Sequence, residues 1–147
     1  LGDTFGTVYE IGLRTTKIRT FDGTLVILPN SRIASGIFEN LSFRTKRREF
    51  FTIGVTYNTS VAKLNKAKQV IKKILTKHKF VDHENIFISF EKFNDFSLDI
   101  RIIYFITEMD YGKYLLIKDE INTSIKKEFE KEKISIAFPT QTIELKK

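Results

Sequence analysis

The sequence predicts an α+β fold in which a small β-barrel or sandwich is followed by a βαββαβ domain and a short C-terminal strand. Residues 1–43 alternate between apolar and polar side chains and are divided by tight-turn residues, which indicates short strands. The later part of the chain switches between a period of two and a period of 3.6 residues, which indicates strands alternating with helices. We therefore expect domains at residues 1–43 and 44–139, with a separate tail at 140–147.

The first domain opens with two predicted strands, Gly6 to Gly12 and Thr15 to Phe21. The second strand ends at Asp22-Gly23, a strong hairpin signal, because a type I′ turn requires positive φ at both central residues. Leu25 to Leu28 reads as the return strand and is apolar at every position, and Pro29 ends it.

A single helical turn should follow this strand, capped by Asn30 or Ser31 and ended by Gly36. Ile37 to Phe43 is then predicted to be a fourth strand, which together with the others would form the small barrel or sandwich. The chain begins at Leu1 rather than methionine and enters strand-like sequence almost at once. We expect it to be a piece of a longer protein that has lost the first strand of this domain.

The second domain has the order strand, helix, strand, strand, helix, strand, which is the split βαβ arrangement of ferredoxin-like domains. Right-handed crossovers would place both helices on one face of a four-stranded antiparallel sheet. The tail alternates at Thr142 to Leu145 and would suit an exposed strand that awaits a partner. The predicted strands are 49–57, 85–93, 97–107 and 133–138, and the predicted helices start after Asn58 to Ser60 and at about Gly112.

Composition narrows the classes of function. The chain has no cysteine, so disulfide scaffolds, thiolate zinc sites and cysteine catalysis are excluded. No segment reaches the roughly 18 to 20 apolar residues of a membrane-spanning helix. The net charge is +7, from 25 basic and 18 acidic residues. An ordinary lysine-rich surface explains this charge, while nucleic acid and an anionic membrane surface are the alternatives.

The search for chemistry finds no catalytic, metal or cofactor site, and we predict that the protein is not an enzyme. His78 and His83 lack a third metal ligand at a suitable spacing. Asp95 and Asp99 flank a predicted β-turn, where aspartate commonly has a structural use. Phosphate-binding glycine loops and nucleophile elbows are missing from the sequence.

Ferredoxin-like domains include RNA-binding modules, so an RNA-binding protein is the runner-up function. These modules carry a basic and aromatic consensus on the third strand, which Ser97 to Phe105 does not match. The second face of that strand presents Asp99 and Ile103, which form a poor platform for stacking bases. We therefore expect no nucleic acid partner.

Residues 6–31, GTVYEIGLRTTKIRTFDGTLVILPNS, closely resemble the cytoplasmic β-domain of the MscS family, the mechanosensitive channels of small conductance. The resemblance continues through ENLS at 39–42, IGVTY at 53–57 and IAFPTQT at 136–142. It spans nearly the whole chain in the right order. The family's pore-forming transmembrane helices have no counterpart in this sequence.

The resemblance implies an Sm-like β-domain followed by a ferredoxin-like domain. In that family seven copies form a hollow cage below the membrane pore, with lateral openings between the two domain layers and a floor made by C-terminal strands. The parent channel would release ions and small solutes during hypo-osmotic shock. It would lie on the cytoplasmic side of the bacterial inner membrane, as part of an integral membrane protein.

Two groups of residues become candidate sites under this resemblance. A strand that is apolar on both faces must be covered on both, so a subunit interface is expected at Leu25, Val26, Ile27 and Leu28, unless both faces are buried within one barrel. The basic junction falls where the lateral openings of the family lie, so it is expected to line them at Arg44, Lys46, Arg47 and Arg48. The alternative is that these four residues pair with Glu39, Glu49 or acids of a neighbouring copy.

Overall fold

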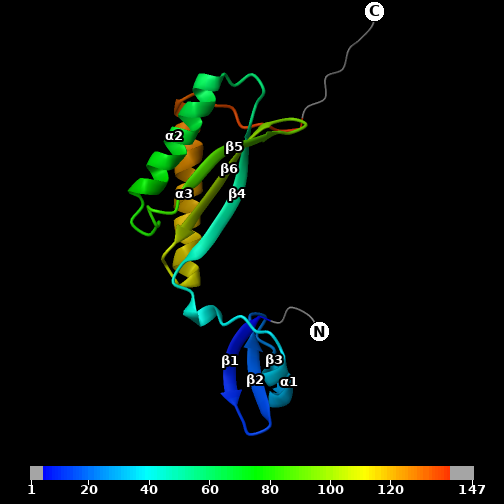
Figure 1. Cartoon of the computed structure of the whole chain (residues 1–147). Helices are drawn as coiled ribbons and strands as arrows, with labels where there is room; N and C mark the ends of the chain where they lie inside the picture. Colours follow the sequence, from blue (N-terminus) through cyan, green and yellow to red (C-terminus); the bar gives the residue numbers. More distant parts are fainter. Residues whose placement is uncertain (1–4, 140–147) are drawn as a thin grey trace, which may run out of the picture. The chain divides into compact units, whose positions relative to one another are not determined.

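The computed structural model describes residues 5–139 and confirms the α+β class. The chain divides into two compact units, residues 1–43 and 44–147 (Figure 1). Each unit is described by itself below. The predicted tail strand at 140–147 lies outside the described residues.

Unit 1 is a three-stranded antiparallel sheet in the order β1-β2-β3. Its strands are β1 (Gly6–Ile11), β2 (Thr15–Thr20) and β3 (Leu25–Pro29). The short helix α1 (Asn30–Ser35) follows β3, and the 3₁₀ helix η1 (Leu41–Phe43) ends the unit. Asn30 connects these elements, because its Nδ2 donates to the Gly12 carbonyl and its Oδ1 accepts from Thr16 Oγ1.

The turn between β2 and β3 differs from the predicted type I′ turn. Gly23 alone has a positive φ, of 81°, and its N–H donates to the Thr20 carbonyl. Thr20 pairs with Thr24 through a backbone bond and through their hydroxyls, so the loop has three residues. A type I turn followed by a left-handed glycine gives this geometry and spares Asp22 the strained conformation.

The fourth strand predicted at residues 37–43 is absent from unit 1. Residues 37–40 form no regular element, and 41–43 form the 3₁₀ helix. Ile37 is fully exposed and Phe38 is 58% exposed, so this apolar segment pairs with no sheet edge in the described part of its unit. An apolar run becomes a strand only where a neighbouring strand accepts its backbone. The described part of unit 1 is therefore an open sheet, not a closed barrel.

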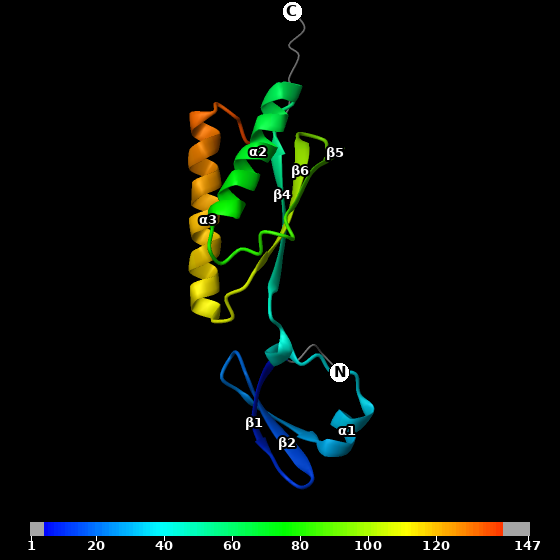
Figure 2. The ribbon, with the colours of Figure 1, turned by 60° about the vertical axis from the view of Figure 1, so that its left-hand side comes forward.

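Unit 2 has an antiparallel sheet in the order β4-β6-β5, with two helices against it. Figure 2 shows both helices on the same side of this sheet, as the sequence predicts. Each helix begins at a side-chain cap, since Ser60 accepts from the Lys63 N–H and Asp110 accepts from the Lys113 N–H. The elements are β4 (Arg47–Val55), α2 (Val61–Lys77), β5 (Phe87–Phe93), β6 (Leu98–Ile106) and α3 (Tyr111–Lys131).

The core of unit 2 lies between the sheet and the helices. The central strand β6 buries every second residue, and Tyr104 is its largest buried side chain. Phe129 and Ile71 close the core from the helical layer. The other buried apolar positions of β6 and of the two helices are Leu98, Ile100, Ile102, Ile106, Leu64, Ala67, Val70, Leu75, Ile117, Ile121 and Ile125.

The last predicted strand, 133–138, is reduced to a bridge between Ile136 and Val55. Two backbone bonds flank it, from Thr56 N–H to Ser135 and from Ala137 N–H to Gly54. Pro139 has no N–H to donate to β4, so the pairing does not extend further along that strand. The segment still lies at the β4 edge, which is where the ferredoxin-like order places the last strand.

Candidate functional site

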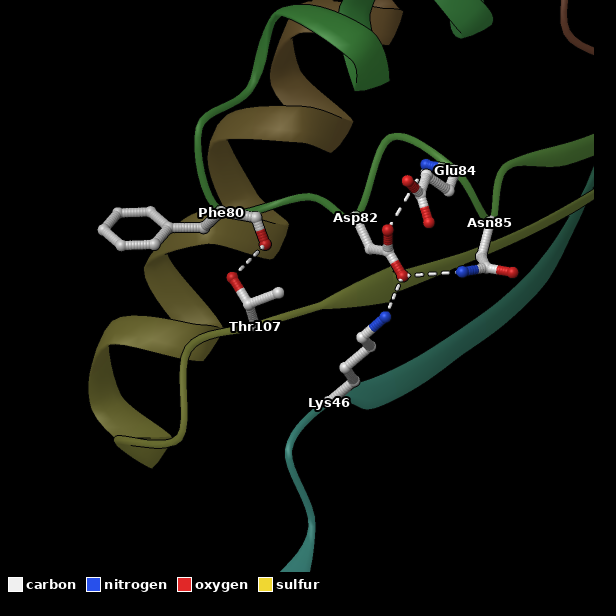
Figure 3. Close-up of polar contacts among 6 residues, drawn as sticks. All are labelled: Lys46, Phe80, Asp82, Glu84, Asn85 and Thr107. Atoms are coloured by element: carbon white, nitrogen blue, oxygen red, sulfur yellow. Dashed lines mark hydrogen bonds and ion pairs between the residues drawn. The ribbon is translucent and has the colours of Figure 1, made fainter.

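The basic junction begins unit 2, and its four side chains have different environments. Figure 3 shows the Lys46 side chain paired with Asp82. Lys46 Nζ lies 2.5 Å from Asp82 Oδ2. The Asp82 side chain is only 10% exposed and also accepts from Asn85 Nδ2 and the Glu84 N–H. The hydrogen bond from Lys46 holds the pKa of Asp82 below its usual value, and the bond from Asn85 adds to this effect.

The loop that carries Asp82 is fixed to the end of β6. The Thr107 hydroxyl donates to the Phe80 carbonyl (Figure 3), and so does the Thr107 N–H. The Asp82 N–H donates to the Phe105 carbonyl. Lys46 therefore binds a rigid part of the unit. Its charge holds the start of β4 in place instead of remaining free for ions.

Arg47 is also used inside unit 2. Its Nη2 donates to the Met109 carbonyl at 2.9 Å, and its guanidinium lies over the rings of Tyr111 and Tyr114 at 5.8 and 5.0 Å from their centroids. Such cation–π contacts stabilise by roughly 0.5 to 2 kcal/mol each. Arg47 thus connects the first residue of β4 to the start of α3.

A buried polar cluster lies beside Arg47, and it was not among the sites predicted from the sequence. Glu49 is 7% exposed, accepts a hydrogen bond from Tyr114 Oη and forms an ion pair with Lys118 Nζ at 2.9 Å. The bond to Glu49 raises the pKa of Lys118, while burial and then Glu49 raise the pKa of Tyr114. The sequence does contain an indication that Glu49 is buried. Glu49 lies two residues before Phe51 and therefore shares the face of β4 that packs on the helices.

Arg44 and Arg48, like Lys46, are exposed members of the junction. Within residues 5–139 neither forms an ion pair, although the Arg48 guanidinium lies 5.9 Å from the Phe50 ring centroid. Within residues 5–139 none of the four cations pairs with Glu39 or Glu49, because Lys46 binds Asp82 and Glu49 binds Lys118 and Tyr114. Among the described residues, the junction thus separates into two tethered and two unpaired cations.

The apolar strand β3 lies at an edge of the unit 1 sheet, and its side chains are poorly covered. Leu25 and Ile27 are 46% and 56% exposed, while Val26 and Leu28 on the other face are half-buried. Thr16 is the one buried residue among those described in unit 1. The described part of the unit therefore does not bury both faces of β3, contrary to the alternative of a closed barrel.

The residues considered for chemistry have structural roles. His78 Nε2 lies 3.3 Å from Glu120, and His83 Nε2 lies 3.1 Å from the His78 carbonyl. Asp99 accepts from Ser97 and Asn94 and thereby stabilises the turn before β6. Across residues 5–139 no group of three histidine or carboxylate side chains is placed to hold a metal ion. The helices of the same residues are too short or too polar to span a bilayer.

Comparison with known proteins gives consistent matches to both units. Residues 1–43 match the family described as "Mechanosensitive ion channel, beta-domain", and residues 50–136 match "Mechanosensitive ion channel MscS, C-terminal". The chain is 47% identical over 142 residues to the small-conductance mechanosensitive channel MscMJ of Methanocaldococcus jannaschii, covering 97% of this chain and 40% of that protein. It is 42% identical over 145 residues to the large-conductance channel MscMJLR of the same organism, with the same coverage.

The fold also matches solved structures. The crystal structure of Helicobacter pylori MscS in its closed state superposes with a TM-score of 0.79 at 24% identity, over 97% of this chain and 55% of that one. At that identity the superposition shows the fold alone. The chain spans about two fifths of the length of the curated relatives it matches.

Proposed function

This chain belongs to the MscS family of mechanosensitive ion channels, and on that premise we propose that it is the cytoplasmic cage portion of a small-conductance channel that releases solutes on hypo-osmotic shock. The family is one of channels and not of enzymes. The observation that carries the proposal is the match of both units, in order, to the two cytoplasmic family regions. The RNA-binding alternative has no comparable support.

We infer a ring of seven copies, as the family resemblance implies. The exposed strand β3 supports this inference, because Leu25 and Ile27 gain cover only from something outside the described part of unit 1. The small sheet also has two open edges, at β1 and β3, which natural sheets pair or cover. A subunit interface at residues 25–28 would cover these side chains and the β3 edge.

Within such a ring, Arg44 would provide the charge at the lateral openings. It is exposed and forms no ion pair within the described residues, and a sevenfold ring repeats its charge seven times. Rings of cationic side chains raise the local concentration of anions within a Debye length of about 8 Å. Lys46 and Arg47 would instead hold the start of unit 2, to which Arg44 is attached, in place.

The location we propose is the cytoplasmic side of the membrane that holds the channel. Two relatives above 40% identity come from an archaeon, so we do not limit this location to the inner membrane of bacteria.

The deciding experiment uses the full-length subunit, expressed in cells that lack their own channels of this kind. We expect survival of osmotic downshock and stretch-activated currents in excised patches. Absence of both, with the protein present in the membrane, contradicts the proposal. Salt-dependent binding of single-stranded RNA at micromolar concentration would favour the alternative.

A further inference from the structure

One face of the unit 2 sheet is not covered by any other described element of that unit. The helices pack on the other face (Figure 2). On the open face Phe50 of β4 and Phe87 of β5 both pair with Ile103 of β6, so the three side chains form a row across the sheet. Phe50 is 54% exposed and Phe87 is 57% exposed. Two phenylalanines are thus presented to solvent side by side with an isoleucine.

This row is unusual for a solvent-facing surface. Antiparallel sheets with one solvated face normally place polar residues there, as this sheet does in the adjacent row of Thr52, Arg101 and Ser89. An apolar patch rimmed by polar residues marks an interaction site. Arg48 and Arg101 both lie over the Phe50 ring, but Arg101 is paired with Glu91. We call Phe50, Phe87, Ile103 and Arg48 the sheet patch.

A second apolar surface occurs on the helical layer of the same unit. Leu115 and Leu116, in the second turn of α3, are 46% and 65% exposed. Asp119 follows on the same outward surface, since residues three and four apart are neighbours on a helix. Asp119 is exposed and forms no ion pair within residues 5–139. We call Leu115, Leu116 and Asp119 the helix patch.

We propose that the helix patch of one copy docks on the sheet patch of the next copy around the ring. The inference rests on the proposed function, because it requires that copies of this chain assemble. The two patches are complementary: two leucines meet two phenylalanines and an isoleucine, and the carboxylate of Asp119 meets the guanidinium of Arg48. They lie on opposite layers of one unit, so each copy offers a different patch to each neighbour.

This head-to-tail relationship distinguishes the proposal from a twofold dimer. A twofold contact brings a patch against its own copy, whereas a closed ring uses two different patches on each subunit. If the sheet patches of two copies docked on each other, Arg48 of one copy would approach Arg48 of the other. Like charges at an interface are unfavourable. The pairing of unlike patches therefore fits a cyclic assembly.

Cysteine cross-linking tests the contact, and the absence of cysteine from these 147 residues provides a clean background. Ser89→Cys and Asn122→Cys place one thiol beside each patch and leave the patch residues intact, because both positions are exposed. The pair is introduced into the full-length subunit, with any other cysteine replaced by serine, and oxidised in membranes. The matched control replaces Asn65, an exposed asparagine of α2, in place of Asn122.

We expect a ladder of disulfide-linked species up to the ring size for the Ser89/Asn122 pair, and monomers for each single variant. Arg48→Asp should reduce the yield several-fold, and adding Asp119→Arg should restore it. An intact ring by native mass spectrometry without this ladder, or a stronger ladder for the Asn65 control, overturns the contact but leaves the ring. A native mass of one subunit overturns the assembly itself.

Discussion

Arg47 Nη2 donates a hydrogen bond to the Met109 carbonyl at 2.9 Å, so the first residue of β4 is attached to the segment that starts α3, sixty-two positions along the chain. The same guanidinium lies over Tyr111 and Tyr114. The family resemblance placed this arginine among the residues expected to line the lateral openings. The structure gives it a role in joining the strand that follows the junction to the helical layer.

Replacing Arg47 should therefore destabilise the protein more than replacing its exposed neighbour. Arg47→Gln removes one hydrogen bond and two ring contacts, so we expect a loss of about 1 to 3 kcal/mol in the free energy of unfolding. Arg44→Gln is the matched control and should stay within about 0.5 kcal/mol. Urea unfolding followed by tyrosine fluorescence measures both. An equal loss of unfolding free energy in the two variants would contradict the role of Arg47 in connecting β4 to the start of α3.

The Glu49 cluster predicts a loss of stability at high pH. Lys118 and Tyr114 have pKa values raised above 10.5 and 10.0 in the folded state, so the folded protein holds both protons more tightly than the unfolded chain. Their contribution is complete below pH 10 and declines as the pH rises through the folded values. Glu49→Gln should make this decline shallower, since it removes the chief cause for Lys118. Urea midpoints between pH 9 and 12 that fall in parallel for both proteins would refute this explanation.

The pair of Lys46 with Asp82 predicts an effect at low pH. The pKa of Asp82 is lowered below 3.8 in the folded state, so its contribution to stability is present above that pH and is lost as the pH falls through the folded value. Lys46→Gln should raise the pKa of Asp82 toward its ordinary value. Carboxyl carbon NMR titration measures this shift, with Arg44→Gln as a variant that should leave it unchanged. An Asp82 titration that does not respond to Lys46→Gln would exclude the pairing in solution.

Arg44, the one cation of the junction for which no partner is proposed, predicts the ion preference of the channel. Arg44→Gln should move the reversal potential in asymmetric salt toward cation preference, because one positive charge per copy leaves the openings. Extending the change to Lys46, Arg47 and Arg48 should add little further shift, since Lys46 and Arg47 are engaged within the unit and Arg48 is engaged in the proposed contact with Asp119. Unchanged selectivity in the quadruple variant would make the junction a linker only.

The apolar strand predicts where the ring is sensitive to mutation. Ile27 is 56% exposed, so Ile27→Asp should leave the fold of a single copy largely intact while reducing the population of rings. Native mass spectrometry of the full-length subunit in detergent measures the assembly. Arg14→Asp, at an exposed position in the loop between β1 and β2, is the control. Rings that survive Ile27→Asp unchanged would place the interface elsewhere.

The sequence determined the features that depend on neighbouring residues. Alternation fixed which residues of β6 face the core, and the helical period fixed the buried stripes of α2 and α3, because side-chain direction follows from local backbone geometry. Local signals also placed the β2–β3 hairpin and both helix starts. The family resemblance rested on short segments that occur in the same order along nearly the whole chain. The identity and order of the residues were therefore enough to recognise it.

Tertiary structure decided which residues become partners. Ile37 to Phe43 has strand-like composition but forms no strand, because it pairs with neither open edge of the sheet in its unit. The four cations of the junction look alike in sequence, yet Lys46 binds Asp82 and Arg47 binds the Met109 carbonyl, while the other two form no ion pair within residues 5–139. Hydrogen bonds and ion pairs form between groups brought together by packing, and sequence separation does not encode those distances.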